Sequence, residues 1–229
     1  MRFNSDQIQK IGKEISNKVD GKTLFDEFSR GRYSTDASVY QIKPLGVVLP
    51  KDTNDVLSLM EYSQKNSVPL LARGGGSSQC GQTVGESVVL DYSKHQNKIL
   101  ELNVEEKYVW VQPGVVLDHL NAYLKPHGLW FPVDVSTSSR ATIGGMSANN
   151  SCGSRSLYYG NMVHNVLAIE AILDDGSIFN FDQINKNYLA TKNNQDRLYK
   201  IIDKFIDVRQ QVGSEIDANW PTTQRRVGG

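Results

Sequence analysis

The sequence LLARGGGSSQCGQTVG, residues 70–85, carries a short apolar run directly into three consecutive glycines. Glycine loses the most backbone entropy on folding, so three in a row are typical of a place where the chain needs left-handed dihedrals or close backbone approach. Successive backbone N–H groups in such a turn form a concave nest for phosphate oxygens, to which Ser77 and Ser78 can add hydroxyl groups and Arg73 charge. The stretch predicts a phosphate-binding loop, with a glycine-rich surface turn as the simpler alternative.

Two common nucleotide-binding motifs do not fit this loop. A P-loop requires GxxxxGK[ST], but residues 76–83 read GSSQCGQT, with Gln82 in place of the lysine. The Rossmann fingerprint GxGxxG also fails, because its sixth position, counted from Gly74, is Gln79. Nucleoside triphosphate chemistry and Rossmann-type dinucleotide binding are therefore disfavoured.

The composition is that of an ordinary globular protein, with 229 residues of which 39% are hydrophobic, and with 25 basic and 25 acidic side chains. Zero net charge provides no basic field for polyanions, so nucleic acid is not expected as a partner. Cys80 and Cys152 make neither a disulfide framework nor a metal-ligand spacing, and we expect reduced thiols and no metal site. No signal-peptide core and no run of 18 apolar residues is present, which predicts a cytoplasmic protein.

Alternating helical and extended patterns predict an α+β chain made of two successive lobes. Isoleucines at positions 8, 11 and 15 recur at helical spacing, so residues 1–35 are predicted to form a helical extension before the main body. The first lobe is predicted at about 36–105, the second at about 106–183, and a helical tail at 184–220. The predicted strands and hairpins of the two lobes lie at 40–50, 68–72, 87–92, 99–104 with 107–112, 129–133, and 165–173 with 177–181. The predicted helices begin at 52 or 53, 116 and about 198.

A second segment of small residues, ATIGGMSANNSCG, spans residues 141–153 and opens a predicted long loop at 143–160. Such a segment lets backbone come within contact distance of a flat ring, and Asn149 and Asn150 can make hydrogen bonds there. The alternative is that Gly144, Gly145 and Ala148 only permit close helix packing. If both lobes face one cleft, the two segments would hold a long ligand from two sides.

Several motifs together resemble one known family. They are ARGGGSSQCGQTVGESVVLDYSK (72–94), VQPGVVLDHLNAYLKPHGL (111–129), PVDVSTSSRATIGGMSANNSCGSRSLYYGNMVHNVL (132–167) and EAILDDG (170–176). Their order and spacing resemble the FAD-binding domain of the vanillyl-alcohol oxidase and para-cresol methylhydroxylase type, in the branch of D-lactate, glycolate and D-2-hydroxyglutarate dehydrogenases. The resemblance implies that each lobe is a small sheet with flanking helices, with FAD between the lobes.

The resemblance also implies cofactor contacts at matching positions. The first loop would surround the FAD pyrophosphate, mostly with backbone N–H groups. Its residues at matching positions are Arg73, Gly74, Gly75, Gly76, Ser77, Ser78, Gly81 and Gln82. Along the adenosine and pyrophosphate side would lie Pro132, Asp134 and Thr137. From the second lobe the flavin would be met by Thr142, Ile143, Gly144, Gly145, Ala148, Asn149 and Gly153. These would be followed by Tyr159, Gly160 and Val163, with Ile169 at the adenine end.

Departures from the family's pattern bear on how FAD would be held. Members that attach FAD covalently carry a histidine where Ser77 stands, or a cysteine where Arg140 and Ala141 stand. Neither nucleophile is present, so non-covalent FAD is predicted. The family's aspartate-proline pair reads Asp134-Val135, which removes rigidity from one turn and leaves the pyrophosphate prediction intact.

The resemblance implies oxidation of a D-2-hydroxy acid by hydride transfer to flavin N5, with an unknown electron acceptor: a quinone, a cytochrome or an iron–sulfur domain. The base and the cation for the substrate carboxylate would come largely from a C-terminal substrate-capping domain, and residues 221–229 resemble the junction into it. No catalytic residue is assigned here. Of the four histidines, only His164 is a candidate for a polar role near the ring, and packing or a hydrogen bond is the favoured role even there.

Three alternatives stay open at this point. The same flavin domain could serve a reductase or an oxidase of another substrate. It could instead be a non-catalytic domain that binds FAD or another diphosphate. A dehydrogenase feeding a respiratory chain could also lie peripherally at the inner membrane.

Overall fold

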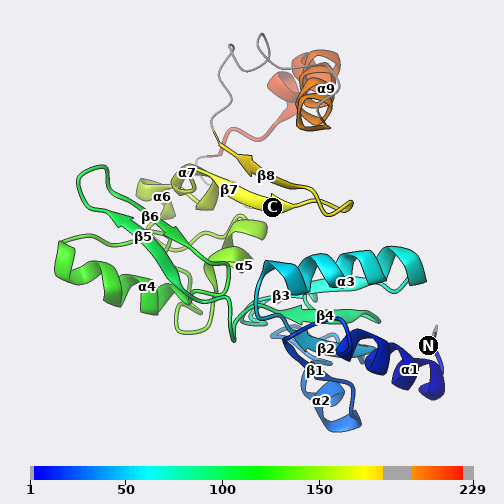
Figure 1. Ribbon diagram of the computed structural model, residues 1–229. Coiled ribbons are helices and arrows are strands. Elements are labelled where there is room, and N and C mark those ends of the chain that lie inside the picture. Colours follow the sequence, from blue (N-terminus) through cyan, green and yellow to red (C-terminus); the bar gives the residue numbers. More distant parts are fainter. Residues whose placement is uncertain (1–2, 183–196, 224–229) are drawn as a thin grey trace.

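The computed structural model describes residues 3–182 and 197–223. A four-stranded sheet in the order β1-β2-β4-β3 forms the centre of the first lobe (Figure 1). Its strands are β1 (Lys22–Leu24), β2 (Gly46–Leu49), β3 (Leu70–Arg73) and β4 (Val88–Asp91). Strands β2, β3 and β4 are parallel, and β1 is antiparallel to β2. Because β3 ends at Arg73, the sheet delivers the chain directly into the glycine loop, as predicted.

Helix α3 (Thr53–Asn66) connects β2 to β3 across one face of this sheet. It begins where the Asp52 carboxylate accepts a hydrogen bond from the Asn54 N–H at 2.8 Å, and it ends at Ser67, which has a φ of 51°. Every residue of β2 and β4 is buried, which is typical of parallel strands covered on both faces. The order strand, helix, strand and loop is therefore as the sequence predicts.

The N-terminal residues belong to the first lobe rather than preceding it. Helix α1 (Ser5–Ser16) buries Ile8, Ile11 and Ile15 in the same core as Val48 and Val88. Helix α2 (Glu27–Arg32) follows β1, whose pairing with β2 extends the sheet back to Lys22. The predicted start of the first lobe near residue 36 is corrected accordingly, because the apolar face of α1 has its partner in this core.

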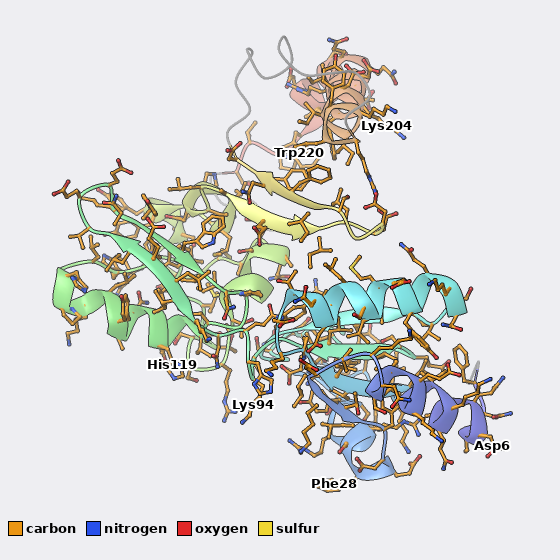
Figure 2. The ribbon with its side chains drawn as sticks, viewed as in Figure 1. Asp6, Phe28, Lys94, His119, Lys204 and Trp220 are labelled. Carbon is orange, nitrogen blue, oxygen red and sulfur yellow. The ribbon has the colours of Figure 1, made fainter. Side chains whose placement is uncertain are left out.

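The boundary predicted between the lobes, at 105/106, falls inside a hairpin. Strands β5 (Ile99–Asn103) and β6 (Tyr108–Val111) pair with each other, and Ile99 and Leu102 pack on Leu120 and Leu124 of helix α4 (Leu117–Leu124). A short 3₁₀ turn, η1 (Lys125–His127), ends at Gly128 with φ 69°. Both hairpin strands thus lie in the second lobe, and the chain crosses between lobes near Lys94 (Figure 2).

The segment predicted as a long loop at 143–160 contains short helices instead. They are α5 (Ile143–Ala148), α6 (Ser156–Tyr159) and α7 (Met162–Asn165). Thr142 caps α5, and Met146 and Met162 anchor α5 and α7 in a core with Leu117. Tertiary burial overrides the low helix propensity of the two glycines in α5. Residues 129–133, predicted as extended, form no strand.

The hairpin of β7 (Ile169–Ile172) and β8 (Ile178–Phe181) turns at 173–177, as the Asp-Asp-Gly sequence predicts. It lies above α3, and helix α9 (Arg197–Asn219) lies beyond it, away from both lobes (Figure 1). In the part of the chain that the structure describes, no helix is long and apolar enough to cross a membrane.

Candidate functional site

The two small-residue segments meet where the lobes join. A Cβ atom added to Gly74 would lie 2.1 Å from Thr142 Oγ1, and one added to Gly75 would lie 2.2 Å from the Arg140 carbonyl oxygen. The Gln82 side-chain amide donates a hydrogen bond of 3.2 Å to Asn149 Oδ1. Segments separated by about 65 residues in the sequence therefore form one continuous surface, as the two-sided ligand hypothesis requires.

The first loop presents a run of unpaired backbone donors. Among the described residues, no hydrogen bond is made by the backbone N–H groups of residues 74–79, and Cys80 N–H binds only Ser78 Oγ, at 3.1 Å. Gly76 and Gly81 have φ values of 64° and 73°, so these two glycines are required by backbone conformation. Consecutive free amides in such a turn form an anion-binding nest. This geometry fits a diphosphate.

Arg73 does not extend into this nest. Its guanidinium donates to the carbonyl oxygens of Thr35 at 2.9 Å, Thr83 at 3.2 Å and Tyr33 at 3.4 Å. Burial lowers the pKa of Arg73, and the Asp91 carboxylate opposes that shift. The suggestion that its side chain supplies charge directly to phosphate is not what the structure shows, because the side chain is turned under the loop.

The second segment contributes an open face of α5 rather than amide donors. The N–H groups of Ile143, Gly144 and Gly145 are satisfied by the carbonyls of Val115 and Pro113 and by Thr142 Oγ1. A Cβ atom on Gly144 would meet Pro113 at 2.5 Å, so close packing explains this glycine.

Close packing does not explain Gly145. A Cβ atom there would meet only the capping Thr142 hydroxyl, at 3.2 Å, and Gly145 is exposed. Ala148 and Asn149 are exposed on the same side of the helix, three and four residues along. The side chains on this face are small enough for a flat ring to lie against the helix.

Asp134 is held inside the second lobe. Its carboxylate accepts hydrogen bonds from Ser154 Oγ at 2.7 Å and from the Arg155 N–H at 3.0 Å. Burial alone would raise the pKa of Asp134, but these hydrogen bonds outweigh it and lower the pKa. A Cβ atom on Gly153 would lie 2.0 Å from Asp134 Oδ1, so Gly153 is small to accommodate this carboxylate. Thr137 lies in the turn before α5, where its carbonyl accepts from the N–H of Arg140.

The remaining predicted positions extend the surface away from the first loop. Tyr159 packs edge-on against Trp130, with 5.2 Å between ring centroids, and Gly160 ends α6 with a φ of 80°. The Val163 N–H donates to Asn150 Oδ1 at 3.0 Å, which joins α7 to the end of α5. Pro132 is half-buried, whereas Val163 and Ile169 are exposed. A ligand that reaches them would have to follow the second lobe outward.

The four histidines lie in different surroundings. His164 Nδ1 accepts a hydrogen bond from the Asn161 N–H at 3.0 Å, which caps α7. His119 lies on the exposed side of α4, at the outer edge of the second lobe (Figure 2). His95 and His127 are also exposed. The hydrogen bond of His164 is of the kind predicted for it, and the structural roles of the other three histidines remain predictions.

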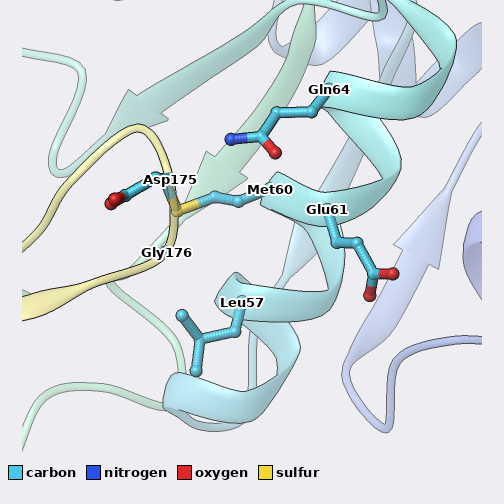
Figure 3. Close-up of a pocket in the computed structure, with 6 residues that line it drawn as sticks. All are labelled: Leu57, Met60, Glu61, Gln64, Asp175 and Gly176. Carbon is cyan, nitrogen blue, oxygen red and sulfur yellow. The ribbon is translucent and has the colours of Figure 1, made fainter.

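A pocket of about 250 Å³ lies elsewhere, between α3 and the β7–β8 turn (Figure 3). Leu57 and Met60 line it from α3, opposite Asp175 and Gly176. Gln64 donates a hydrogen bond to the Asp174 carbonyl beside it. Two of its lining residues, Glu61 and Asp175, are acidic, and none is basic, so the pocket does not suit a phosphate. It marks the contact of the hairpin with the first lobe.

Sequence reasoning missed the residues that support the first loop from below. The Tyr33 hydroxyl donates to Asp91 Oδ2 at 2.7 Å, and Thr83 Oγ1 donates to Asp36 Oδ2 at 3.1 Å. Burial, followed by the hydrogen bond to Asp91, raises the pKa of Tyr33 to about 12. These partners lie 47 to 58 residues apart in sequence, and no local pattern connects them.

Comparison with protein families gives one match, described as "FAD binding domain", over residues 44–182. Among curated proteins, D-2-hydroxyglutarate dehydrogenase of Escherichia coli (strain K12) is 37% identical over 216 residues, covering 91% of this chain and 21% of that protein. The enzyme of the same name from Haemophilus influenzae is 42% identical over 155 residues, covering 66% and 15%. Glycolate oxidase subunit GlcD of Bacillus subtilis is 37% identical over 176 residues, covering 75% and 37%. The chain thus spans a minor part of each relative's length.

Solved structures show the same fold at lower identity. Alkyldihydroxyacetonephosphate synthase matches with a TM-score of 0.66 at 20% identity, covering 79% of this chain and 35% of the other. p-Cresol methylhydroxylase matches with a TM-score of 0.61 at 18% identity, covering 77% and 36%. The predicted two-lobed α+β fold is confirmed, although β5–β6 and β7–β8 are separate hairpins and Ile172 of β7 packs against the core of the first lobe.

Proposed function

Since the chain belongs to the FAD-binding domain family, we propose that it is the cofactor-binding part of a flavin-dependent oxidoreductase that oxidises D-2-hydroxy acids. The relatives named D-2-hydroxyglutarate dehydrogenase and glycolate oxidase subunit GlcD support this substrate class. The chain covers between 15 and 37% of these relatives, so the activity of the whole protein is part of the proposal.

The observation that carries the proposal is the run of unpaired amides at residues 74–79 beside the open face of α5. The amides would bind the FAD diphosphate, and Gly145, Ala148 and Asn149 would lie against the isoalloxazine ring. When bound, FAD would supply the acceptor for the hydride that leaves the hydroxy acid. Gln82 and Asn149, already joined by a hydrogen bond, would close the wall between the two contacts.

Non-covalent attachment is part of the same proposal. The first loop offers only hydroxyl groups at Ser77 and Ser78, and the segment before α5 offers Arg140 and Ala141. None of these is a histidine or cysteine nucleophile. Acid precipitation of FAD-loaded protein should therefore release all the flavin to the supernatant, and flavin retained in the pellet would contradict this part of the proposal.

The rest of the reaction needs groups from outside this chain. A base for the substrate hydroxyl and a cation for its carboxylate would come from a substrate-capping domain after residue 221, and the electron acceptor would be a quinone, a cytochrome or an iron–sulfur domain. Each of these electron acceptors is compatible with a protein in the cytoplasm or with one bound peripherally at the inner membrane.

Titration of the protein with FAD, followed by quenching of flavin fluorescence, tests the cofactor site. Gly145→Asp places a carboxylate on the open face of α5, where it would displace the ring and repel the diphosphate. An acidic residue in the first turn is compatible with the helix, so the fold should be retained. We expect FAD affinity to fall by at least about tenfold, equivalent to about 1.4 kcal/mol.

Gly31→Asp is the matched control, because a Cβ atom there meets nothing within 4 Å and α2 lies on the far side of the sheet from α3. Its FAD affinity should equal that of the unchanged protein. Gly75→Asp is a poor test, since its side chain would strike the Arg140 carbonyl whether or not FAD binds there. Unchanged affinity in Gly145→Asp would contradict the placement of the ring.

Dye-linked assays of the intact protein with D-2-hydroxyglutarate, D-lactate and glycolate test the substrate class. Reduction of the dye by one of these acids, and not by the L-enantiomers of the chiral ones, is the expected result. FAD-loaded intact protein that oxidises none of them would contradict the proposed substrate class while leaving the cofactor site in place.

A further inference from the structure

Arg73 occupies the inside of the first loop. It is the last residue of β3, and its half-buried guanidinium donates to three backbone carbonyls, those of Tyr33, Thr35 and Thr83. Thr83 lies at the end of the loop, whereas Tyr33 and Thr35 lie in the segment between α2 and β2. One side chain therefore ties the returning end of the loop to the first lobe.

The loop is folded around this side chain. Gly76 has a φ of 64°, and a Cβ atom on it would lie 2.4 Å from Arg73 Nη2. Glycine at this position thus allows the loop backbone to pass directly over the guanidinium. The hydrogen bond from Thr83 Oγ1 to Asp36, at 3.1 Å, fastens the same end of the loop a second time.

The Asp91 carboxylate, next to Arg73, has other hydrogen-bond partners than the guanidinium. Asp91 lies opposite Arg73 in the parallel register of β3 and β4. Its two oxygens accept hydrogen bonds from the Tyr33 hydroxyl at 2.7 Å and from Ser93 Oγ at 2.6 Å. The Arg73 guanidinium lies over the Tyr33 ring, 5.2 Å from its centroid. The guanidinium is therefore oriented towards the carbonyl oxygens of Tyr33, Thr35 and Thr83.

We propose that Arg73 is a positioning residue for the cofactor: its planar guanidinium binds carbonyl oxygens at the inside of the loop and so keeps the amides of residues 74–79 directed outward at the diphosphate. The inference rests on the proposed function. It assigns the side chain to ordering the loop and adding positive charge beneath it, without contact with phosphate. The three hydrogen bonds leave from two nitrogens, Nη1 to Tyr33 and Thr83 and Nη2 to Thr35, and the single nitrogen of a lysine does not have this spread, so lysine is not an equivalent residue here.

The test compares Arg73→Lys and Arg73→Ala with Arg209→Lys as the matched control. Arg209 also binds a backbone carbonyl, that of Gly213, but it lies on α9, away from the site. FAD affinity should fall by at least about tenfold in both Arg73 variants and stay unchanged in Arg209→Lys. Because the amides of residues 74–79 are unpaired without a ligand, hydrogen exchange is compared at saturating FAD: it should be faster at residues 74–79 in the Arg73 variants than in the unchanged protein, whereas exchange in β2 and β4 should not differ. Guanidinium ion added to Arg73→Ala should restore part of the affinity.

Each result distinguishes the positioning role of Arg73 from another role. Full affinity in Arg73→Lys would show that only charge matters, and it would overturn the positioning role while leaving FAD binding intact. Absence of FAD binding by the unchanged protein would instead overturn the proposed function and this inference with it. Faster exchange throughout β2 and β4 would show a general structural role and would also overturn the inference.

A measurement on the unchanged protein keeps the inference testable if the variants do not fold. Nitrogen-15 NMR of the arginine side chains should show Arg73 Nη–H groups protected from solvent exchange both without and with FAD. Coupling of those nitrogens to FAD phosphorus, or loss of their protection when FAD binds, would assign Arg73 as a direct phosphate ligand and would refute the positioning role.

Discussion

Truncation of Asp55 is the sharpest test of how the N-terminal residues join the first lobe. Asp55 is buried near the start of α3, and its carboxylate accepts three backbone hydrogen bonds: from Asp20 at 2.7 Å, from Gly21 at 2.9 Å and from Lys51 at 2.7 Å. Asp20 and Gly21 lie between α1 and β1. The carboxylate therefore fastens the N-terminal elements to α3.

The expected loss follows from these three contacts. A hydrogen bond to a charged group contributes about 1.5–3 kcal/mol, but the freed N–H groups are only partly buried and regain some water. For Asp55→Ala we therefore expect a loss of about 3–5 kcal/mol. In Asp55→Asn, an NH₂ group that cannot accept a hydrogen bond replaces one carboxylate oxygen. It would take the position of Oδ1, which faces only the Asp20 N–H, because Oδ2 faces both Gly21 and Lys51. About half of the loss should then remain.

Urea unfolding followed by circular dichroism measures the change in the free energy of unfolding. Asp118→Ala, at an exposed carboxylate in the first turn of α4, is the control and should cost under about 0.5 kcal/mol. A loss below about 1 kcal/mol in Asp55→Ala would refute the reasoning, because the N-terminal elements would then be held by apolar packing alone.

Two further predictions concern the site. Gly144→Ala should lower the free energy of unfolding by about 1–3 kcal/mol because its Cβ would strike Pro113, whereas Gly145→Ala, whose Cβ would meet only the Thr142 hydroxyl at 3.2 Å, should cost less than about 1 kcal/mol; equal effects in urea unfolding would contradict the assignment of their two roles. Tyr33 has a pKa raised from 10.0 to about 12, so its folded form keeps a proton that the unfolded chain loses, and stability should fall as pH rises from 10 to 12. Tyr33→Phe should make that fall shallower, and an unchanged slope would exclude Tyr33 as its source.

Local patterns were sufficient for the elements around the first loop. The apolar run before the glycines, the capping aspartate of α3 and the Asp-Asp-Gly turn each determine their structure within a few residues. The two-lobed fold and the family were predicted from motif order, and the comparisons confirm both.

The features that could not be predicted from the sequence depend on packing between residues far apart in the chain. Nothing near Ile99 indicates that β5 packs on α4 rather than on the first sheet. The glycines of residues 144 and 145 look alike in sequence, yet one packs against Pro113 and the other is open. The partners of Arg73 at Tyr33 and Thr35 lie about 40 residues before it, beyond the reach of any local signal. The predicted contacts of the 22 site residues with FAD remain predictions.

A crystal structure of the protein with FAD tests the central claim most directly. The account predicts diphosphate oxygens within hydrogen-bond distance of backbone N–H groups in residues 74–79, with the isoalloxazine ring against Gly145 and Ala148. FAD bound elsewhere, or bound between the lobes with those amides still unpaired, would contradict it.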